Sequence, residues 1–205
     1  NGKMKSREGT VVDADDLFEE MVQMATASCR EHAGEGVSDE ELAARGEIIG
    51  MGALKFMLLK FNAKTTMMFD PAASIRFEGD TGPYVQYACT RIRSILRKAA
   101  ERGIAYAADK VDWSLAGAPE EKALAVTAAF YPAALQQAAA RRDASGLVDY
   151  LLNLAKAFNA FYRECPVLAA PTPELAAVRL ALAAAAGSIL EDGLKTLTIG
   201  VPDAM

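Results

Sequence analysis

The sequence is short of the residues that metal and redox chemistry need. Among 205 residues there are three cysteines, one histidine and one tryptophan. The cysteines stand far apart with no CxxC pair, which excludes a zinc signature and a disulfide scaffold and favours reduced thiols in the cytoplasm. The single histidine, His32, excludes any mechanism within this chain that uses two histidines. We therefore expect no metal site.

Long apolar runs are also missing. No stretch of about 18 uninterrupted apolar residues occurs, so we expect no membrane-spanning segment and a cytoplasmic protein. No GxxxxGK[ST] sequence occurs either, which excludes a nucleotide-binding P-loop. The first residue is asparagine and no leader-like sequence follows it, so we expect an internal or C-terminal piece of a longer protein.

Helical signals dominate what is present. Capping residues and prolines predict helix starts near Asp13, Ser38, Asp70, Pro83 and Thr172, and the Ser38 helix is expected to run to about Lys60. Three glycines on that helix indicate a close neighbour. The last helix is expected to reach about Thr198, and Trp113 is predicted to anchor an irregular stretch. The fold class is all-α, a helical bundle. The three glycines of the Ser38 helix are Gly46, Gly50 and Gly52. The remaining predicted helices cover about 119–130, 132–142 and 145–164.

Charge is distributed unevenly along the chain. Residues 1–79 carry a net charge of -5 and residues 80–205 are neutral. Within the second part, the helix predicted over 82–103 has five basic residues against Glu101 alone, a net charge of +4. An acidic chain with one basic helix is a weak signal for an anionic partner.

The predicted helix after Pro83 carries two stripes when its residues are placed 100° apart. One stripe is apolar and is predicted to be buried. The other is aromatic and cationic, a combination that can stack an unpaired base and hold its phosphate. Periodicity alone favours a solvated flank whose tyrosines support a neighbouring helix. The second stripe comprises Tyr84, Tyr87, Arg91, Ser94, Lys98 and Arg102.

The first ten residues form a polar run with two lysines, an arginine and two hydroxyls among glycines. A loop of this composition can place ammonium groups on a polyphosphate and stabilise the charge of a leaving group. Composition alone favours a solvated tail.

Three separate segments carry motifs, and together they cover nearly the whole chain. The segments are Lys3 to Val12, Phe77 to Tyr87 followed by Arg91-Ile92, and Arg179 to Leu182 followed by Asp192 to Lys195 and Met205. In this order they resemble arginyl-tRNA synthetases, a family of class I aminoacyl-tRNA synthetases. The first is similar to the KMSKS loop of that family, the second to a marked helix entry, and the third to the DALR anticodon-binding domain.

The resemblance implies an enzyme that uses ATP, with Mg²⁺, to activate arginine and then transfers it to tRNA. Lys3, Met4 and Ser6 match the signature loop that contacts ATP, and Lys3 is the candidate catalytic phosphate contact. Ser6 replaces the second signature lysine, and Lys5 is displaced by one position. The implied domains are a signature-loop remnant (1–12), a helical connection (13–73) and the anticodon-binding domain (74–205).

The resemblance also implies which residues lie near the anticodon loop of the arginine tRNA. The match strengthens the RNA-contact interpretation of the aromatic and cationic stripe. Asp192 and Lys195 are expected to be structural, as an intrahelical pair or cap. The implied tRNA-binding residues are Tyr84, Tyr87, Arg91, Asn159, Tyr162 and Met205.

The catalytic half of such an enzyme has no counterpart in the sequence. His32 is alone and is expected at a helix end, so it does not form the family's HIGH signature, and no parallel sheet is predicted. We expect the chain alone to bind no ATP, to be inactive, to be a monomer, and to need the catalytic core of a longer protein. The alternative is a non-catalytic helical module that docks to other proteins through its apolar and alanine-rich faces.

Overall fold

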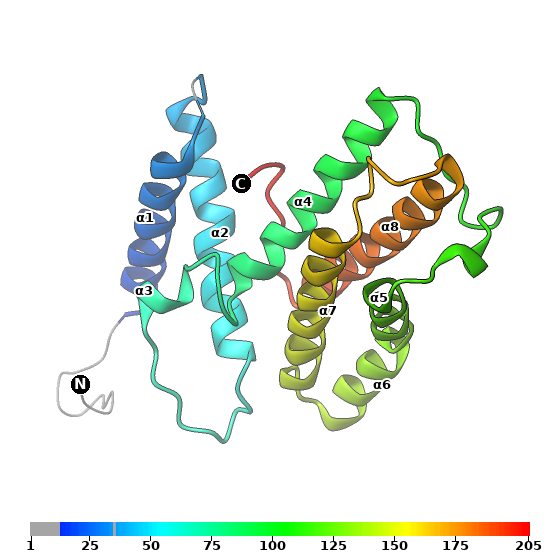
Figure 1. Cartoon of the computed structure of the whole chain (residues 1–205). Coiled ribbons are helices and arrows are strands. Elements are labelled where there is room, and N and C mark those ends of the chain that lie inside the picture. The colour runs from blue at the N-terminus through cyan, green and yellow to red at the C-terminus, as the bar shows by residue number, and fades with distance from the viewer. Residues whose placement is uncertain (1–12, 35) are drawn as a thin grey trace.

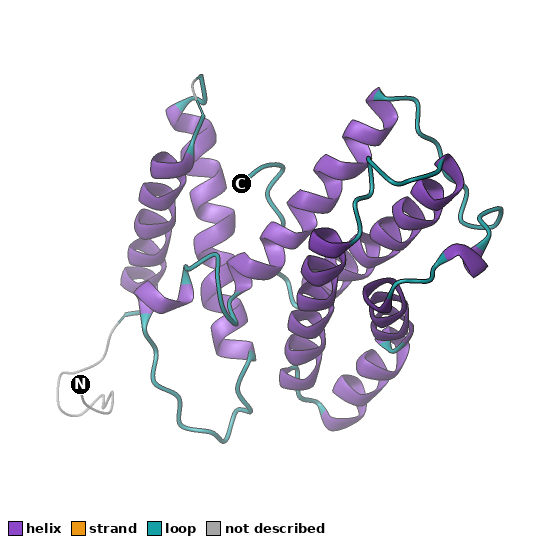
Figure 2. Ribbon diagram, in the orientation of Figure 1, coloured by secondary structure: helices purple, strands orange, loops and turns teal. Residues whose placement is uncertain are grey.

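A computed structural model describes residues 13–34 and 36–205. Every regular element in these residues is helical, which confirms the predicted all-α bundle (Figure 2). The elements are α1 (Ala14–His32), α2 (Asp39–Leu59), α3 (Pro71–Ser74), α4 (Gly82–Glu101), the 3-10 helix η2 (Trp113–Leu115), α5 (Pro119–Ala129), α6 (Tyr131–Arg141), α7 (Ser145–Glu164) and α8 (Pro173–Thr196).

Three of the long helices, α2, α4 and α8, begin at capping residues that the sequence predicts. The Ser38 hydroxyl accepts a hydrogen bond from the Glu41 amide, and the Thr81 hydroxyl accepts one from the Tyr84 amide. Thr172 does the same for α8. These side chains satisfy amides that have no partner within the first helical turn, so the chain enters each helix at a defined residue.

The helices form a hairpin beside a bundle (Figure 1). The antiparallel pair α1 and α2 stands on one side, and α4 crosses from this pair to α7 and α8. A large apolar core joins α4, α5, α7 and α8, while a small separate cluster of Met21, Ala53 and Leu54 joins α1 to α2. The last residues run back between α2 and α4.

Helix α8 is the central helix of the bundle. It is long and apolar enough to cross a membrane by length and composition, but over half of its most apolar stretch is buried inside the protein. Its buried face packs against α4 and α7, and Gly187 lies directly against Ile92. Burial within this core accounts for the composition of α8.

Gly46, Gly50 and Gly52 do mark a close helix contact, as predicted. A Cβ atom at Gly50 would lie 2.7 Å from the Met21 carbonyl oxygen of α1, and one at Gly46 would collide with Thr26. Gly52 faces the side chain of Gln86 on α4. The glycines therefore let α2 approach α1 and α4 more closely than any side chain would allow.

Replacing Gly50 with alanine is expected to destabilise the fold by about 2–3 kcal/mol, because the new methyl group meets backbone atoms that cannot move aside. Gly146 on α7 has open space at its Cβ position, so Gly146→Ala is a matched control that should be neutral or slightly stabilising. Urea denaturation of both variants measures the difference, and equal effects would contradict the close contact.

The prediction for Trp113 is wrong. Its side chain is 46% exposed on η2 and does not anchor the stretch between α4 and α5. Smaller apolar residues of this stretch, Ile104, Val111 and Ala116, pack against the core instead. These small contacts hold the stretch in place. The residue types alone do not show whether several small contacts or one large side chain anchors such a stretch.

Candidate nucleic-acid interface

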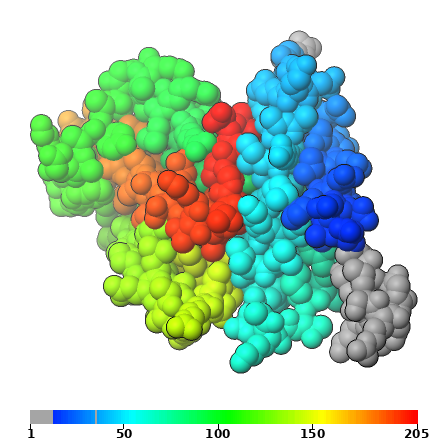
Figure 3. Space-filling view, turned by 180° about the vertical axis from the view of Figure 1, so that it is seen from behind, coloured from blue at the N-terminus to red at the C-terminus, as the bar shows by residue number. Residues whose placement is uncertain are grey.

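A groove of about 910 Å³ opens beside α4 and is the largest hollow described here. Its walls come from α4, from the end of α7 with the segment that follows it, and from the C-terminal tail (residues 198–205). Figure 3 shows the tail wedged between α4 and α2 on the rear face. The lining includes Tyr87, Arg91, Arg93, Ser94, Arg97, Lys98, Tyr162, Arg163, Pro166, Ala169, Asp203 and Met205.

Arg91 lies at the centre of the site. Its guanidinium donates hydrogen bonds to Asn159 Oδ1 at 2.9 Å and to the Tyr87 hydroxyl at 3.0 Å. The same group lies over the Tyr87 ring, 4.5 Å from the centroid, and over the Tyr162 ring at 5.0 Å. A planar cation between two rings is rigid and strongly oriented, which suits it to recognise a flat, negatively charged ligand.

Aromatic rings continue on both sides of Arg91. Tyr162 stacks on Phe158, with ring centroids 6.1 Å apart, while Tyr87 contacts Phe77 at 6.5 Å. Tyr162 is 42% exposed although its inner neighbour is fully buried. The core thus supports an exposed ring at the edge of the groove, where a base could stack on it.

The groove is positive although the chain is acidic. Five cationic side chains line it and Asp203 is its only lining carboxylate. The whole chain has a net charge of -5. Cations concentrated in one hollow of an acidic protein attract an anion to that hollow rather than to the surface in general.

The structure brings most of the predicted binding residues together. Tyr87, Arg91, Tyr162 and Met205 line the groove, and Asn159 is hydrogen bonded to Arg91. Tyr84 is different, because it is half-buried against the main core and does not line the groove. The other five residues lie together in the structure, and the predicted role of all six residues in binding stays a prediction.

A smaller hollow of about 470 Å³ adjoins the groove on the α1–α2 side. Tyr87, Arg91 and Met205 line both hollows and therefore form the partition between them. His32 and Arg45 contribute from α1 and α2. The site thus reaches from the bundle onto the helical hairpin.

His32 lies at the end of α1, as predicted. Its Nδ1 atom is 2.9 Å from the Ser28 carbonyl oxygen, and its ring meets Phe77 edge-on at 6.1 Å. These contacts give it a role in supporting the smaller hollow.

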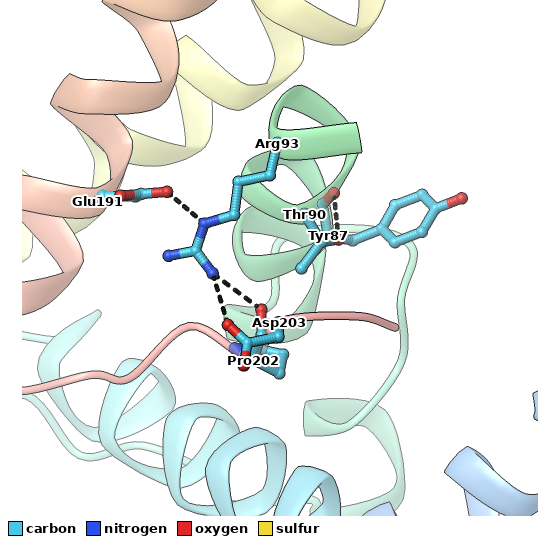
Figure 4. Close-up of polar contacts among 6 residues, drawn as sticks. All are labelled: Tyr87, Thr90, Arg93, Glu191, Pro202 and Asp203. Carbon is cyan, nitrogen blue, oxygen red and sulfur yellow. Dashed lines mark hydrogen bonds and ion pairs between the residues drawn. The ribbon is translucent and has the colours of Figure 1, made fainter. Parts of the chain in front are cut away.

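The C-terminal tail is held by side chains that the sequence analysis did not single out. Arg93 donates to Glu191 Oε1 at 2.7 Å and to the Pro202 carbonyl oxygen at 3.2 Å (Figure 4). Fully buried Gln86 donates to the Gly200 carbonyl oxygen at 2.8 Å and to Ile48. Gln86 and Arg93 lie two turns apart on one face of α4, and this spacing was the feature of the sequence that could have indicated a shared role.

A buried ion pair supports the opposite wall. Arg179 Nε lies 2.7 Å from Glu121 Oε1, and Arg179 Nη1 donates to the Pro166 carbonyl oxygen at 2.9 Å. The other oxygen of Glu121 accepts the Ala118 amide. Arg179 thus ties α8 to α5 and to the segment that lines the groove at Pro166.

Asp192 has an interhelical partner. Its carboxylate accepts a hydrogen bond of 2.5 Å from the Tyr131 hydroxyl of α6. Asp192 is thus structural, but it ties α8 to α6 instead of pairing with Lys195 within its own helix.

The residues of the signature loop cannot be placed. Lys3, Met4 and Ser6 lie outside the described residues. Among the residues that the structure describes, no group of three or more His, Cys, Asp or Glu side chains could hold a metal ion. The side chains that line the groove include aromatic rings and cations instead.

The three thiols differ in access. Burial raises the pKa of Cys89 to about 12 and also raises the pKa values of Cys165 and of the half-buried Cys29. At pH 8 we expect a thiol reagent to modify Cys29 first and the two buried cysteines only after unfolding.

The Cys89 thiol ionises near pH 9 in the unfolded chain, but in the folded protein it stays protonated up to its raised pKa. Its contribution to the stability of the native state should therefore decline as the pH rises from 9 toward that pKa. Reagent titration with and without urea checks the reactivity, and rapid labelling of all three thiols in the native chain would contradict the buried positions.

A known family of domains matches the part of the chain that forms the groove. The family model of the DALR anticodon binding domain matches residues 85–205, which is more than half of the chain. The chain belongs to the DALR anticodon binding domain family. The match begins inside α4 and ends at Met205, so it includes the helices and the tail that form the groove.

Curated arginine–tRNA ligases resemble the chain over its full length. The arginine–tRNA ligase of Bacteroides fragilis is 40% identical over 205 residues, all of this chain and 34% of that protein. The arginine–tRNA ligase of Treponema denticola is 41% identical over 207 residues, all of this chain and 35% of that protein. The chain therefore spans about a third of the length of the curated relatives it matches.

Solved structures show the same arrangement. The arginyl-tRNA synthetase of Thermus thermophilus superposes with a TM-score of 0.86 at 33% identity, covering 96% of this chain and 33% of that one. The Plasmodium falciparum enzyme superposes with a TM-score of 0.81 at 21% identity, covering 95% and 34%, and supports the fold alone. The hairpin before α4 is thus part of the matched fold along with the DALR domain.

Proposed function

We propose that this chain is the anticodon-binding part of an arginine–tRNA ligase and that its groove takes the anticodon loop of the arginine tRNA. The observation that carries the proposal is Arg91, held between the rings of Tyr87 and Tyr162 in a positive groove. The match to the DALR family over α4–α8 supports it, as does the likeness to arginine–tRNA ligases over the full chain.

The groove suits single-stranded RNA better than a duplex. Bases in a hairpin loop are unstacked, so they can stack on exposed rings such as Tyr162 while guanidinium groups meet the flanking phosphates. A regular duplex offers no free base faces to these rings. The few cations in the groove imply a modest, salt-dependent affinity.

In the whole enzyme, ATP with Mg²⁺ would activate arginine in a catalytic core, and this part would hold the tRNA. Residues 1–12 would belong to the ATP-contacting loop through Lys3, Met4 and Ser6. Residues 13–73 would connect the core to the anticodon domain at 74–205. We also propose a cytoplasmic monomer that acts together with the catalytic core of the same enzyme.

Binding of two RNAs tests the proposal. One is an arginine tRNA transcript, and the other is the same transcript with its anticodon loop replaced by an unrelated tetraloop. We expect the first to bind with an affinity that falls as salt rises, and the second to bind at least tenfold more weakly. Equal binding of both RNAs would contradict the proposal, and no binding of either would favour a protein-interaction module.

A further inference from the structure

Three side chains hold backbone carbonyl oxygens of the C-terminal tail. Lys55 of α2 donates to the Thr198 carbonyl at 2.7 Å, Gln86 of α4 to the Gly200 carbonyl at 2.8 Å, and Arg93 of α4 to the Pro202 carbonyl at 3.2 Å. Carbonyls of residues 200 and 202 point to the same side where a chain is extended, so one face of α4 can hold both. Arg93 makes the last of these contacts before Met205.

Arg93 has two carboxylate partners, from α8 and the tail, whereas Arg97 and Arg163 each have one carboxylate partner on their own helix. The Nε atom of Arg93 is 2.7 Å from Glu191 Oε1, and its Nη1 atom is 3.6 Å from Asp203 Oδ1. Figure 4 shows the guanidinium between these two carboxylates, with the Pro202 carbonyl beside it. A guanidinium enclosed by two carboxylates offers little attraction to a phosphate.

The contacts of Arg93 fix the position of the last residues of the tail. Pro202 is buried and held, and only three residues separate it from the end of the described chain. Ala204 and Met205 line the groove, and Met205 also lines the smaller hollow. If Pro202 were released, the part of the wall that separates the two hollows could move away from Tyr87 and Arg91.

We propose that Arg93 is a positioning residue for RNA binding, acting through the tail to hold Met205 against the site at Tyr87 and Arg91. The inference rests on the proposed function for its RNA ligand. Arg93 itself touches no nucleotide in this account. Its fork of donors joins Glu191 on α8 to Pro202 on the tail, which a lysine cannot reproduce because its ammonium lacks that planar geometry.

A double-mutant cycle tests this assignment with the arginine tRNA transcript. Arg93→Gln is expected to weaken binding by about tenfold in the native chain, as losing a charged hydrogen bond would. In a chain that already carries Met205→Ala, the same change should cost less than about twofold. The salt dependence should stay unchanged, because no phosphate contact is lost.

Two matched variants separate positioning from simple charge. Arg93→Lys keeps the charge, and we expect it to bind as weakly as Arg93→Gln. Arg97→Gln removes a cation one turn away on the same helix, which is 70% exposed, and its effect should be independent of Met205→Ala. Full rescue by Arg93→Lys, or additive losses for Arg93→Gln and Met205→Ala with a smaller salt slope, would overturn the proposal.

The position of the tail can also be measured without RNA. With methionine methyl groups labelled by ¹³C, the Met205 signal of Arg93→Gln should shift and narrow toward that of a free side chain, while Arg97→Gln should leave it unchanged. If the signal changes but wild-type chain does not bind tRNA, the proposed function fails and the holding of the tail stands. If the Met205 signal is unchanged in Arg93→Gln, the positioning role is wrong.

Discussion

Replacing Arg91 with methionine is expected to weaken binding of an arginine tRNA by roughly 30- to 100-fold. The change removes a cation together with the two ring contacts and the two hydrogen bonds that hold Tyr87 and Asn159 in place. A charged hydrogen bond and a stacked base are each worth about 1–3 kcal/mol, and the site loses the support for both. Fluorescence anisotropy with a labelled tRNA measures the change.

Arg102→Met is the control for Arg91→Met, because Arg102 is an exposed cation at the end of the same helix and does not line the groove. It should weaken binding by no more than about threefold through general electrostatics. The fold should survive both changes, since neither side chain belongs to the core, and circular dichroism can verify this. Equal losses in the two variants would show that charge alone, and not the built site, attracts the RNA.

Breaking the buried pair between Arg179 and Glu121 is expected to have the largest effect on stability. Glu121 is 1% exposed, and Arg179 also holds the Pro166 carbonyl. Glu121→Gln leaves a buried guanidinium without its counter-charge, and Arg179→Met leaves a buried carboxylate, so each should cost about 3–5 kcal/mol. Urea denaturation measures the free energy of unfolding.

The double variant Glu121→Leu/Arg179→Met gives the sharper test. It leaves no buried charge unpaired, so it should recover part of the stability that either single change removes. As a control, Asp39→Asn breaks the exposed pair between Arg30 and Asp39 and should cost less than about 1 kcal/mol. Single changes at Glu121 and Arg179 that cost no more than this control would contradict a structural role for the buried pair.

Local sequence signals were sufficient for the helices. The caps at Ser38, Thr81 and Thr172, and the prolines that follow Thr81 and Thr172, act within one turn, so their effect depends on neighbouring residues only. The periodicity of α4 correctly predicted its buried apolar stripe, because a helix turns by a constant angle, but it did not predict that Tyr84 of the second stripe packs against the core.

Contacts between distant residues were beyond such signals. The pair of Glu121 and Arg179 joins residues 58 positions apart, and Arg93 reaches Pro202 across 109 positions. Glu121, Arg179 and Arg93 are residue types that are ordinary at exposed helical positions, and only the packing of several helices shows that they are held. The prediction for Trp113 was wrong because a large apolar side chain was expected to be buried, whereas this residue stays 46% exposed.

The candidate site was predictable in part from the sequence. Tyr87 and Arg91 share a stripe that periodicity alone reveals, while Asn159 and Tyr162 came from the family resemblance and are brought to Arg91 by the packing of α7 on α4. The function of all these residues in RNA binding stays a prediction until it is measured.

Site-specific photo-crosslinking tests the central claim most directly. A benzophenone amino acid would replace Tyr162, whose ring is 42% exposed at the groove, and in a second chain it would replace Phe130, which is 61% exposed and does not line the groove. We predict that the probe at position 162 crosslinks to nucleotides of the anticodon loop and that the probe at position 130 does not. Equal crosslinking from both positions, or crosslinks from position 162 confined to the acceptor arm, would contradict the account.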